Sequence, residues 1–326
     1  MRDVARAANV SVATVSRVLN TPHKVSKETL TRVEQKIAEL RFVPSAAARA
    51  INSGRSKILG ALIPTLDSDI FSQTITAIER RLADYGFSLV VATTEDDRDL
   101  ELRKASALLN IGVEGLFLSG VTHNDDLHAL LDRTSVPAVA ISYFSPAYHI
   151  PTIGYDNFEA ARSACAHLVE LGHRNIVFVH GPTENNDRTR ARVAGVTSLA
   201  SGLELSCVET ELSVPGGSVA AAEILQRPAL PSAILCASDF LAYGVLHELH
   251  RAGVAVPEQV SVMGIHDLPG SEVVVPRLTT VRLPVQDMGS KAADALANWV
   301  VDQSRPTAIS LATEVVVRES TRRLRP

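Results

Sequence analysis

The sequence has few aromatic residues, few cysteines and no long hydrophobic runs. Only 4% of its 326 residues are aromatic, so its cores must consist of Ala, Val, Leu and Ile. Its three cysteines, Cys165, Cys207 and Cys236, are too widely spaced for a disulfide framework or a zinc site, and we expect all three to be small core residues. No apolar run approaches the roughly 18 residues that span a bilayer, and no signal-peptide pattern opens the chain. These absences predict a soluble, cytoplasmic protein that does not bind membranes.

Sequence motifs for catalysis are also missing. The chain has no Gly-x-Ser-x-Gly elbow, no phosphate-binding loop of the Walker type and no His-Glu-x-x-His pair. The ten histidines are scattered, and the acidic run 95–97 is expected to be a solvated surface. We therefore predict no catalytic residue, no metal site and no cofactor.

Charge is distributed very unevenly along the chain. Residues 1–57 hold eleven Lys and Arg against four Asp and Glu, a net charge of +7, whereas the remaining residues carry −11. A bias this concentrated favours a polyanionic partner at one end only. The charge pattern therefore predicts that the N-terminal part binds nucleic acid.

The first of three predicted short helices covers residues 3–8, which are rich in helix formers. It is followed by Asn9, which tolerates the left-handed backbone of a tight turn. Ser11 is a good N-cap for the second helix. In that helix Val15, Val18 and Leu19 fall on one apolar stripe.

The third helix is predicted to begin near Ser26, which provides a cap. It carries the apolar stripe Val33, Ile37 and Leu40. A short helix, a tight turn, a second short helix, a loop and a longer helix form a helix-turn-helix layout.

The second helix is predicted to enter a major groove of double-stranded DNA. Its side opposite the apolar stripe carries small or hydrogen-bonding residues. Arg17 suits a bidentate contact to guanine, and Val12 and Ala13 suit thymine methyl groups or close approach. The DNA-binding residues predicted in this helix and at its cap are Ser11, Val12, Ala13, Thr14, Ser16, Arg17 and Asn20.

The run from Asp3 to Ser56, DVARAANVSVATVSRVLN followed by VSKETLTRVEQKIAELRFVPSAAARAINSGRS, resembles the DNA-binding head of the LacI/GalR transcription regulators. Motif order, spacing and content agree over about fifty residues. Two features differ: Asn9 stands where the family usually has Gly, and the family carries several residues before Asp3. We therefore expect either a start assigned too late or a truncated form.

A short hinge helix is predicted to follow the head, because Pro44 marks a helix start and Gly54 a helix end. So short a helix is marginal alone, so its folding is expected to be coupled to DNA binding. The resemblance implies that two such helices, one from each subunit of a homodimer, pack in a minor groove. It places an apolar wedge at Ile51 and a further DNA contact at Ala48.

From Ile58 onward, short apolar strands alternate with amphipathic helices, which is typical of parallel sheets with helices on both faces. Strands are predicted at 58–63, 88–92, 115–119, 138–142, 175–180, 207–211, 233–237 and 261–265. Helices are predicted at 71–85, 100–110, 125–133, 159–171, 189–201, 218–226 and 240–252. Two similar lobes of this kind imply a ligand-binding cleft at the carboxyl ends of their strands.

The predicted fold is α/β, with an N-terminal helix-turn-helix head and a two-lobed, doubly wound core. This core resembles the periplasmic-binding-protein-like core of the same family over its full length. We expect the head at 1–44, the hinge and linker at 45–57 and the effector-binding and dimerisation core at 58–326. The expected lobes are 58–154 with 284–311, and 155–283 with 312–326.

The resemblance also implies which residues contact a small effector. Arg192 matches the family's arginine that holds a polar group of the effector, and Asp239 stands where the family has Asp or Asn facing the cleft. The remaining contacts lie at other strand ends of the two lobes. The full predicted set is Ser68, Asp69, Phe71, Ser142, Asp156, Arg192, Asp239 and His266.

His266 is the most informative departure from the family, which commonly has Asp at this position for sugar hydroxyls. A carboxylate would repel an anionic ligand, whereas a histidine can donate a hydrogen bond to it and can be cationic. With Arg192 across the cleft, a sugar acid is favoured over a neutral sugar, as in the gluconate-repressor branch. The alternative is that His266 is only a loop residue and the ligand is a neutral sugar.

The sequence as a whole predicts a dimeric repressor that binds a near-palindromic operator and is controlled by a carbohydrate effector. Two alternative functions are compatible with a doubly wound core: a sugar-binding protein of a transport system and a sugar-modifying enzyme. The basic head opposes the first, and the missing catalytic motifs oppose the second. Without a C-terminal heptad tail, a dimer is favoured over a tetramer.

Overall fold

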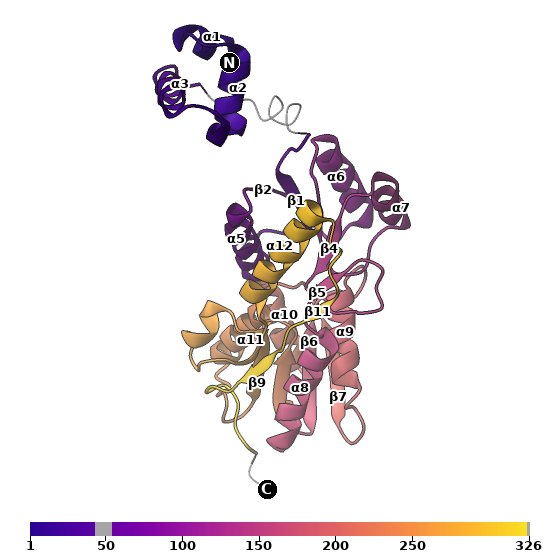
Figure 1. Ribbon diagram of the computed structural model, residues 1–326. Coiled ribbons are helices and arrows are strands. Elements are labelled where there is room, and N and C mark those ends of the chain that lie inside the picture. Colours follow the sequence, from indigo (N-terminus) through magenta and orange to yellow (C-terminus); the bar gives the residue numbers. More distant parts are fainter. Residues whose placement is uncertain (43–53, 325–326) are drawn as a thin grey trace. The chain divides into compact units, whose positions relative to one another are not determined.

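The computed structural model describes residues 1–42 and 54–324, which fall into two compact units, Met1–Lys57 and Ile58–Pro326. We call the first unit the head and the second the body (Figure 1). No helix in the described ranges is long and apolar enough to cross a membrane.

Residues 1–42, the described part of the head before the gap, form three helices, as predicted. Their bounds are α1 (Arg2–Ala7), α2 (Val12–Asn20) and α3 (Lys27–Glu39), with a 3₁₀ turn η1 (Pro22–Lys24) between the last two. Asn9 adopts the predicted left-handed backbone with φ of 52°. The hydroxyls of Ser11 and Ser26 accept backbone N–H groups of α2 and α3, so both predicted caps are confirmed.

A small apolar core holds these three helices together. Its buried members are Val4, Ala5, Ala8, Val15, Val18 and Val33. One residue of the predicted stripe was wrong: Leu40 is 48% exposed. The chain turns at Arg41, where φ is 46°, and Phe42 packs on the core instead. The predicted hinge contacts Ala48 and Ile51 lie outside the described residues.

The body contains two six-stranded sheets, and we call the part built on each sheet a lobe. The sheet of lobe one has the strand order β11-β5-β4-β3-β1-β2. Its strands are β1 (Ile58–Ile63), β2 (Ser88–Thr93), β3 (Leu116–Ser119), β4 (Ala138–Ile141), β5 (Thr152–Gly154) and β11 (Ile309–Ser310). The helices of this lobe are α5 (Asp69–Asp84), α6 (Arg98–Asn110), α7 (Asp125–Thr134) and α12 (Val285–Asp302).

The sheet of lobe two has the order β12-β10-β9-β8-β6-β7. Its strands are β6 (Asn175–His180), β7 (Glu204–Glu209), β8 (Ala233–Cys236), β9 (Ser261–His266), β10 (Thr279–Arg282) and β12 (Glu314–Val316). Its helices are α8 (Asn157–Glu170), α9 (Asp187–Thr197), α10 (Val214–Leu225) and α11 (Asp239–Arg251), followed by the 3₁₀ turn η2 (Pro269–Glu272). The pairings in both sheets are parallel except for β10 with β12, which is antiparallel.

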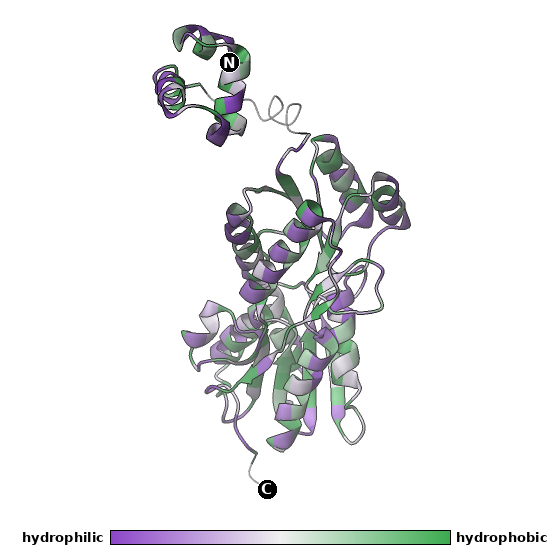
Figure 2. Ribbon diagram, viewed as in Figure 1, coloured by the Kyte–Doolittle hydropathy of each residue, from purple (hydrophilic) through white to green (hydrophobic). Residues whose placement is uncertain are grey.

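Apolar residues gather on the strands and on the inner faces of the helices, while the outer helix faces are hydrophilic (Figure 2). The central strands β1, β3 and β8 are buried almost throughout. Such continuous apolar strands are typical of parallel sheets covered on both faces.

The chain passes between the lobes at three places in the body. It leaves lobe one after β5, returns after β10 to form α12 beside α5, and crosses again between β11 and β12. The prediction missed β5 and β11 because strands of two or three residues carry too little pattern. Cys207 was wrongly predicted as a core residue: it is exposed because β7 is an edge strand.

Candidate functional site

A cavity of about 490 Å³ lies between the two lobes of the body. Its walls come from the carboxyl ends of strands in both sheets, the usual position of ligand sites in such folds. The structure brings five of the eight predicted effector residues together here: Ser68, Phe71, Ser142, Arg192 and His266. The other three, Asp69, Asp156 and Asp239, are absent from the described lining.

Arg192, on α9, is the central cation of this cavity. It is 5% exposed, and its guanidinium donates to the side-chain oxygen of Asn157 at 3.0 Å and to the carbonyl of Ala237 at 2.7 Å. Among the described residues no carboxylate forms an ion pair with it. Burial therefore lowers the pKa of Arg192 to about 10, so the group is cationic at neutral pH but uncompensated.

His266, at the end of β9, meets the same guanidinium. Its Nε2 lies 3.0 Å from Nη1 of Arg192. Because a guanidinium only donates, Nε2 must accept, so the ring proton is on Nδ1. That Nδ1 is buried and has no partner among the described groups.

The surroundings of His266 decide which of its two charge states it adopts. Burial, followed by the charge of Arg192, lowers the pKa of His266 well below its ordinary value. The ring is therefore a neutral hydrogen-bond donor at pH 7.

A second buried arginine, Arg188, lies one turn before Arg192 on α9 and also lines the cavity. Unlike Arg192, it is compensated: its Nη2 donates to Asp96 at 3.0 Å, and its Nη1 lies 3.4 Å from Asp187. Burial opposes the charge of Arg188, but these two carboxylates outweigh it and raise its pKa. The acidic run 95–97, predicted to be solvated, thus supplies an ion-pair partner across the cavity.

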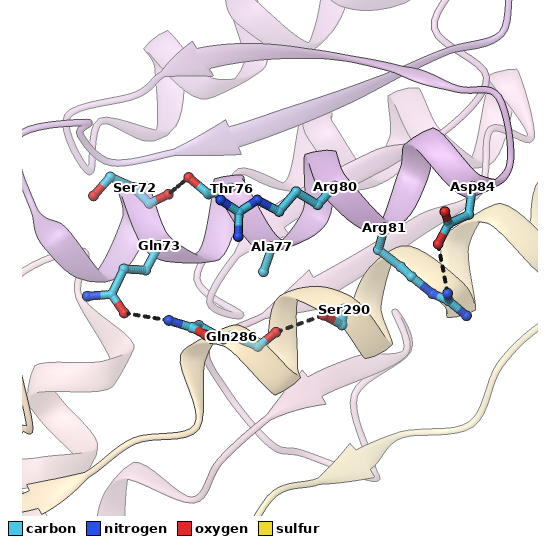
Figure 3. Close-up of a pocket in the computed structure, with 9 residues that line it drawn as sticks. All are labelled: Ser72, Gln73, Thr76, Ala77, Arg80, Arg81, Asp84, Gln286 and Ser290. Carbon is cyan, nitrogen blue, oxygen red and sulfur yellow. Dashed lines mark hydrogen bonds and ion pairs between the residues drawn. The ribbon is translucent and has the colours of Figure 1, made fainter.

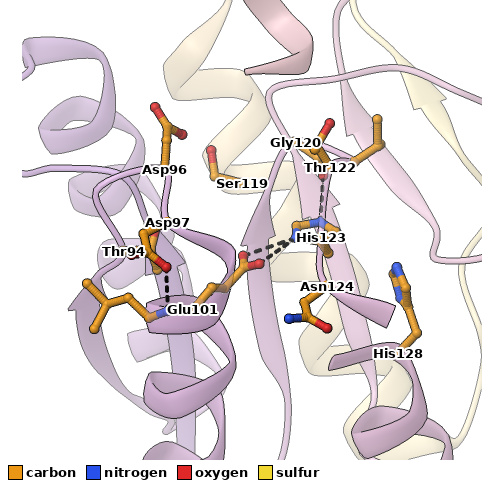
Figure 4. A network of polar contacts seen from close by, with 12 residues as sticks. Thr94, Asp96, Asp97, Glu101, Ser119, Gly120, Thr122, His123, Asn124 and His128 are labelled. Atoms are coloured by element: carbon orange, nitrogen blue, oxygen red, sulfur yellow. Dashed lines mark hydrogen bonds and ion pairs between the residues drawn. The ribbon is translucent and has the colours of Figure 1, made fainter. Parts of the chain in front are cut away.

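Asp187, the first residue of α9, also connects this helix to lobe one through hydrogen bonds. Its carboxylate accepts the backbone N–H groups of Val121 and Thr122, which follow β3. The loop is braced from behind by His123, whose Nδ1 lies 2.9 Å from the Glu101 carboxylate and whose Nε2 lies 3.1 Å from the Gly120 carbonyl (Figure 4). Buried polar contacts therefore hold the loop against α6, in the position from which it binds Asp187.

The three acids outside the cavity have other contacts. Asp156 is exposed and caps α8 by accepting the N–H of Glu159 at 3.0 Å, and Asp69 is an exposed residue in the first turn of α5. Asp239 is fully buried and accepts hydrogen bonds from Thr280, Ser271 and the backbone of Leu268. Its carboxylate joins α11 to the segments on either side of η2, so we correct its predicted role from ligand contact to positioning residue.

Asp239 makes the stability of the body depend on pH. Burial raises its pKa from 3.8 to about 6, although its three hydrogen bonds oppose the shift. A raised carboxyl pKa gives a stability contribution that is complete below about pH 4 and is lost as pH rises through about 6. We expect the unfolding free energy of the wild type, relative to Asp239→Asn, to fall by roughly 1–2 kcal/mol over this window. Urea unfolding of both proteins at pH 4.5 and 7.5 measures it, and a constant difference contradicts the expectation.

Another hollow of about 490 Å³ lies on the surface where α5 meets α12 (Figure 3). Its side chains bond mainly to each other: Gln286 donates to Gln73 at 3.4 Å, and Arg81 donates to Asp84 at 2.9 Å. Arg81 also pairs with Asp294 at 2.6 Å. Arg81 is compensated, and Arg80, which also lines the hollow, is exposed to solvent, so the cavity between the lobes is the better candidate for a ligand site.

In the head, α2 presents the predicted surface. Val15 and Val18 point into the core, while Ser11, Val12, Ala13 and Arg17 are exposed. Thr14 and Ser16 are half-buried, and the hydroxyls of Thr14 and Ser11 lie 2.9 Å apart. Asn20 is the last residue of the helix. An exposed face of small residues beside one arginine is compatible with close approach to DNA.

A helix-turn-helix head followed by a two-lobed, ligand-binding body defines a class of DNA-binding regulators. Residues 1–45 match the model of bacterial regulatory proteins of the lacI family, and residues 165–321 match a periplasmic binding protein-like domain. The chain is 32% identical to catabolite control protein A of Staphylococcus aureus (strain MRSA252) over 308 residues, 92% of each protein. It is 29% identical to the HTH-type transcriptional regulator GntR of Pseudomonas aeruginosa, covering 98% of this chain and 95% of that one.

Among solved structures, the lac repressor dimer bound to operator and the anti-inducer ONPF superposes with a TM-score of 0.88, at 28% identity over 98% of both chains. The chain therefore belongs to the lacI family of bacterial regulatory proteins and is a DNA-binding transcriptional regulator. The relatives compared here are regulators rather than enzymes, in agreement with the missing catalytic motifs.

The sequence-based prediction missed several cavity residues. Arg188 and Asp96 are 92 positions apart, so only the folded chain shows that they pair. Phe240 and Tyr155 also line the cavity. Arg188 could have been found from its spacing, because residues four apart on a helix lie on the same face and Arg188 is four residues before Arg192.

Proposed function

We propose that this regulator binds a small anionic carbohydrate, a sugar acid such as gluconate, between its lobes and that the ligand controls its affinity for operator DNA. The observation that carries the proposal is the buried guanidinium of Arg192, which has no carboxylate partner among the described residues and lines the cavity. A ligand carboxylate would supply the missing charge in a geometry that guanidinium groups favour.

Two further features of the cavity support an anionic sugar. The unpartnered Nδ1–H of buried His266 needs an acceptor, and a ligand carboxylate or hydroxyl can provide one. Phe71 and Phe240 line the same space and offer apolar surface to the C–H faces of a sugar ring, while Ser68 and Ser142 offer hydroxyls.

On the DNA side, we infer that the exposed face of α2 contacts base edges of a near-palindromic operator, with one head in each half-site of a homodimer. The lac repressor dimer on its operator, a relative of the same fold, supports this arrangement. Residues 1–44 bind the major groove, and 45–57, including Ala48 and Ile51, connect the head to the body and contact the minor groove. Repression follows if the operator overlaps a promoter.

Two measurements test the proposal with full-length protein. Calorimetric titration compares gluconate, galactonate and glucuronate with glucose and galactose. We expect binding of at least one acid and no measurable binding of the neutral hexoses. A neutral hexose that binds while every acid fails would exclude an anionic effector.

The second measurement follows duplex binding by fluorescence anisotropy. DNA from upstream of the protein's own gene is compared with shuffled DNA of equal length, over a series of salt concentrations and with or without the bound acid. Specific binding that weakens steeply with salt and changes with the acid is expected. Equal affinity for both duplexes would exclude sequence-specific regulation.

A further inference from the structure

The two buried arginines of the cavity differ in one respect: Arg188 has carboxylate partners and Arg192 has none. Both are less than 10% exposed and both line the same space. Within the described residues, Arg188 pairs with Asp96 at 3.0 Å and with Asp187 at 3.4 Å, whereas no carboxylate pairs with Arg192. The cavity therefore contains one uncompensated positive charge rather than two.

Of the two carboxylate partners of Arg188, Asp96 is the one that affects the net charge of the cavity lining. Asp187 also pairs with Arg188, through its Oδ1 at 3.4 Å, while its Oδ2 accepts two backbone N–H groups of lobe one; it does not line the cavity. Asp96 lines the cavity, so its negative charge faces the ligand space as well as Arg188. Two other acids of the lining, Asp67 and Glu211, are exposed, and solvent screens their charges.

The Asp96–Arg188 pair also joins the two lobes. Asp96 follows β2 of lobe one and lies beside Ser119, as Figure 4 shows, whereas Arg188 comes from α9 of lobe two. Arg188 also donates to the hydroxyl of Ser119 at 3.4 Å. The charge of the cavity is thus fixed by a contact that exists only while the lobes are together.

A ligand with one negative charge neutralises Arg192 and leaves no excess charge in the cavity. A dianion brings a second negative charge into a space whose other guanidinium is occupied and whose wall carries the Asp96 carboxylate. The side chain of Asp96 is 35% exposed, so solvent screens its charge only in part, and the second charge of the ligand is repelled.

We propose that Asp96 determines the charge of the ligand: by occupying Arg188 it restricts the cavity to monoanionic sugar acids and excludes phosphorylated sugars. This inference rests on the proposed binding of an anion at Arg192. A sugar phosphate carries close to two negative charges above pH 7 and so belongs to the excluded class.

Asp96→Asn tests the inference because it removes the negative charge that lines the cavity beside Arg188, keeps the size of the side chain and leaves the Asp187 contact in place. The probes are gluconate, a monoanion, and glucose 6-phosphate, a dianion at pH 7.5, each titrated by calorimetry into full-length protein. We expect the affinity for glucose 6-phosphate relative to gluconate to rise by at least about tenfold in Asp96→Asn. Because both probes require the lobes to be together, the ratio is insensitive to any general weakening of closure.

Two control variants accompany this one. Asp96→Glu retains the charge, and Asp126→Asn removes a carboxylate from exposed α7 of the same lobe, away from the cavity lining. Both should keep the ratio of the wild type. An unchanged ratio in Asp96→Asn, or an equal change in Asp126→Asn, overturns the inference while leaving gluconate binding by the wild type intact. If the wild type binds no sugar acid at all, the proposed function itself fails.

Discussion

Replacing Arg192 with glutamine is expected to weaken sugar-acid binding by at least about 100-fold and to remove the effect of the acid on operator binding. Removing one partner of a buried, hydrogen-bonded charge pair costs 2–5 kcal/mol or more in measured complexes. Glutamine keeps a donor at the position of the Nε that binds Asn157, but it lacks the Nη1 donor to Ala237 and the positive charge, and His266 loses the donor that fixes its tautomer. Calorimetry gives the affinity for the acid, and fluorescence anisotropy gives the operator response.

The matched control is Arg190→Gln on the same helix. Arg190 donates to the Thr183 carbonyl and the Thr122 hydroxyl, and it does not line the cavity. We expect its loss to change sugar-acid affinity less than about threefold. Operator binding without the acid should be normal in both variants, which shows that each one is folded. An Arg192→Gln protein that still binds the acid with near wild-type affinity contradicts the assigned anion site.

The second large effect is expected in the head. Arg17→Glu should reduce affinity for the specific operator by at least about 100-fold, since it removes the proposed bidentate base contact and places a negative charge against the DNA. Arg17 is exposed on α2, so this substitution leaves the core of Val15, Val18 and Val33 in place. Anisotropy titrations on operator and shuffled DNA, at two salt concentrations, measure both affinity and discrimination.

Arg32→Glu provides the comparison, because it makes the same change of charge on α3. Arg32 lies 3.8 Å from Glu28 on the helix surface and is not on the proposed base-reading face. We expect it to weaken binding to both duplexes to a similar extent, as a change in overall charge does. Arg17→Glu, in contrast, should remove most of the preference for the operator. Equal preference in the two variants would rule out a base-reading role for Arg17.

The helices within residues 1–42 of the head could be predicted almost completely from the sequence because their signals are local. Ser11 and Ser26 cap their helices as expected, and Asn9 takes the left-handed backbone. Leu40 was misplaced since the helix ends one residue before it, and a turn at Arg41 replaces it in the core with Phe42. End effects of this kind depend on the last turn of the helix rather than on its periodicity.

The cavity was predictable only in part. Arg192 and His266 could be placed there by resemblance, but the tautomer of the histidine follows from a 3.0 Å contact that no sequence pattern contains. The role of Asp239 was missed because three donors from distant segments converge on it. The pairing of Asp96 with Arg188 depends on how two lobes meet, which is a property of tertiary structure.

The strands β11 and β12 complete the edges of both sheets, and both follow residue 308. During synthesis the head, whose described core is contained in residues 1–42, has all its contacts early, since domains generally fold from the N-terminus as they emerge from the ribosome. Lobe one cannot finish its sheet until translation has passed β11, and lobe two cannot finish its sheet until translation has passed β12. A premature stop codon ahead of β11 would therefore release a chain in which the described core of the head is complete and each sheet of the body lacks an edge strand.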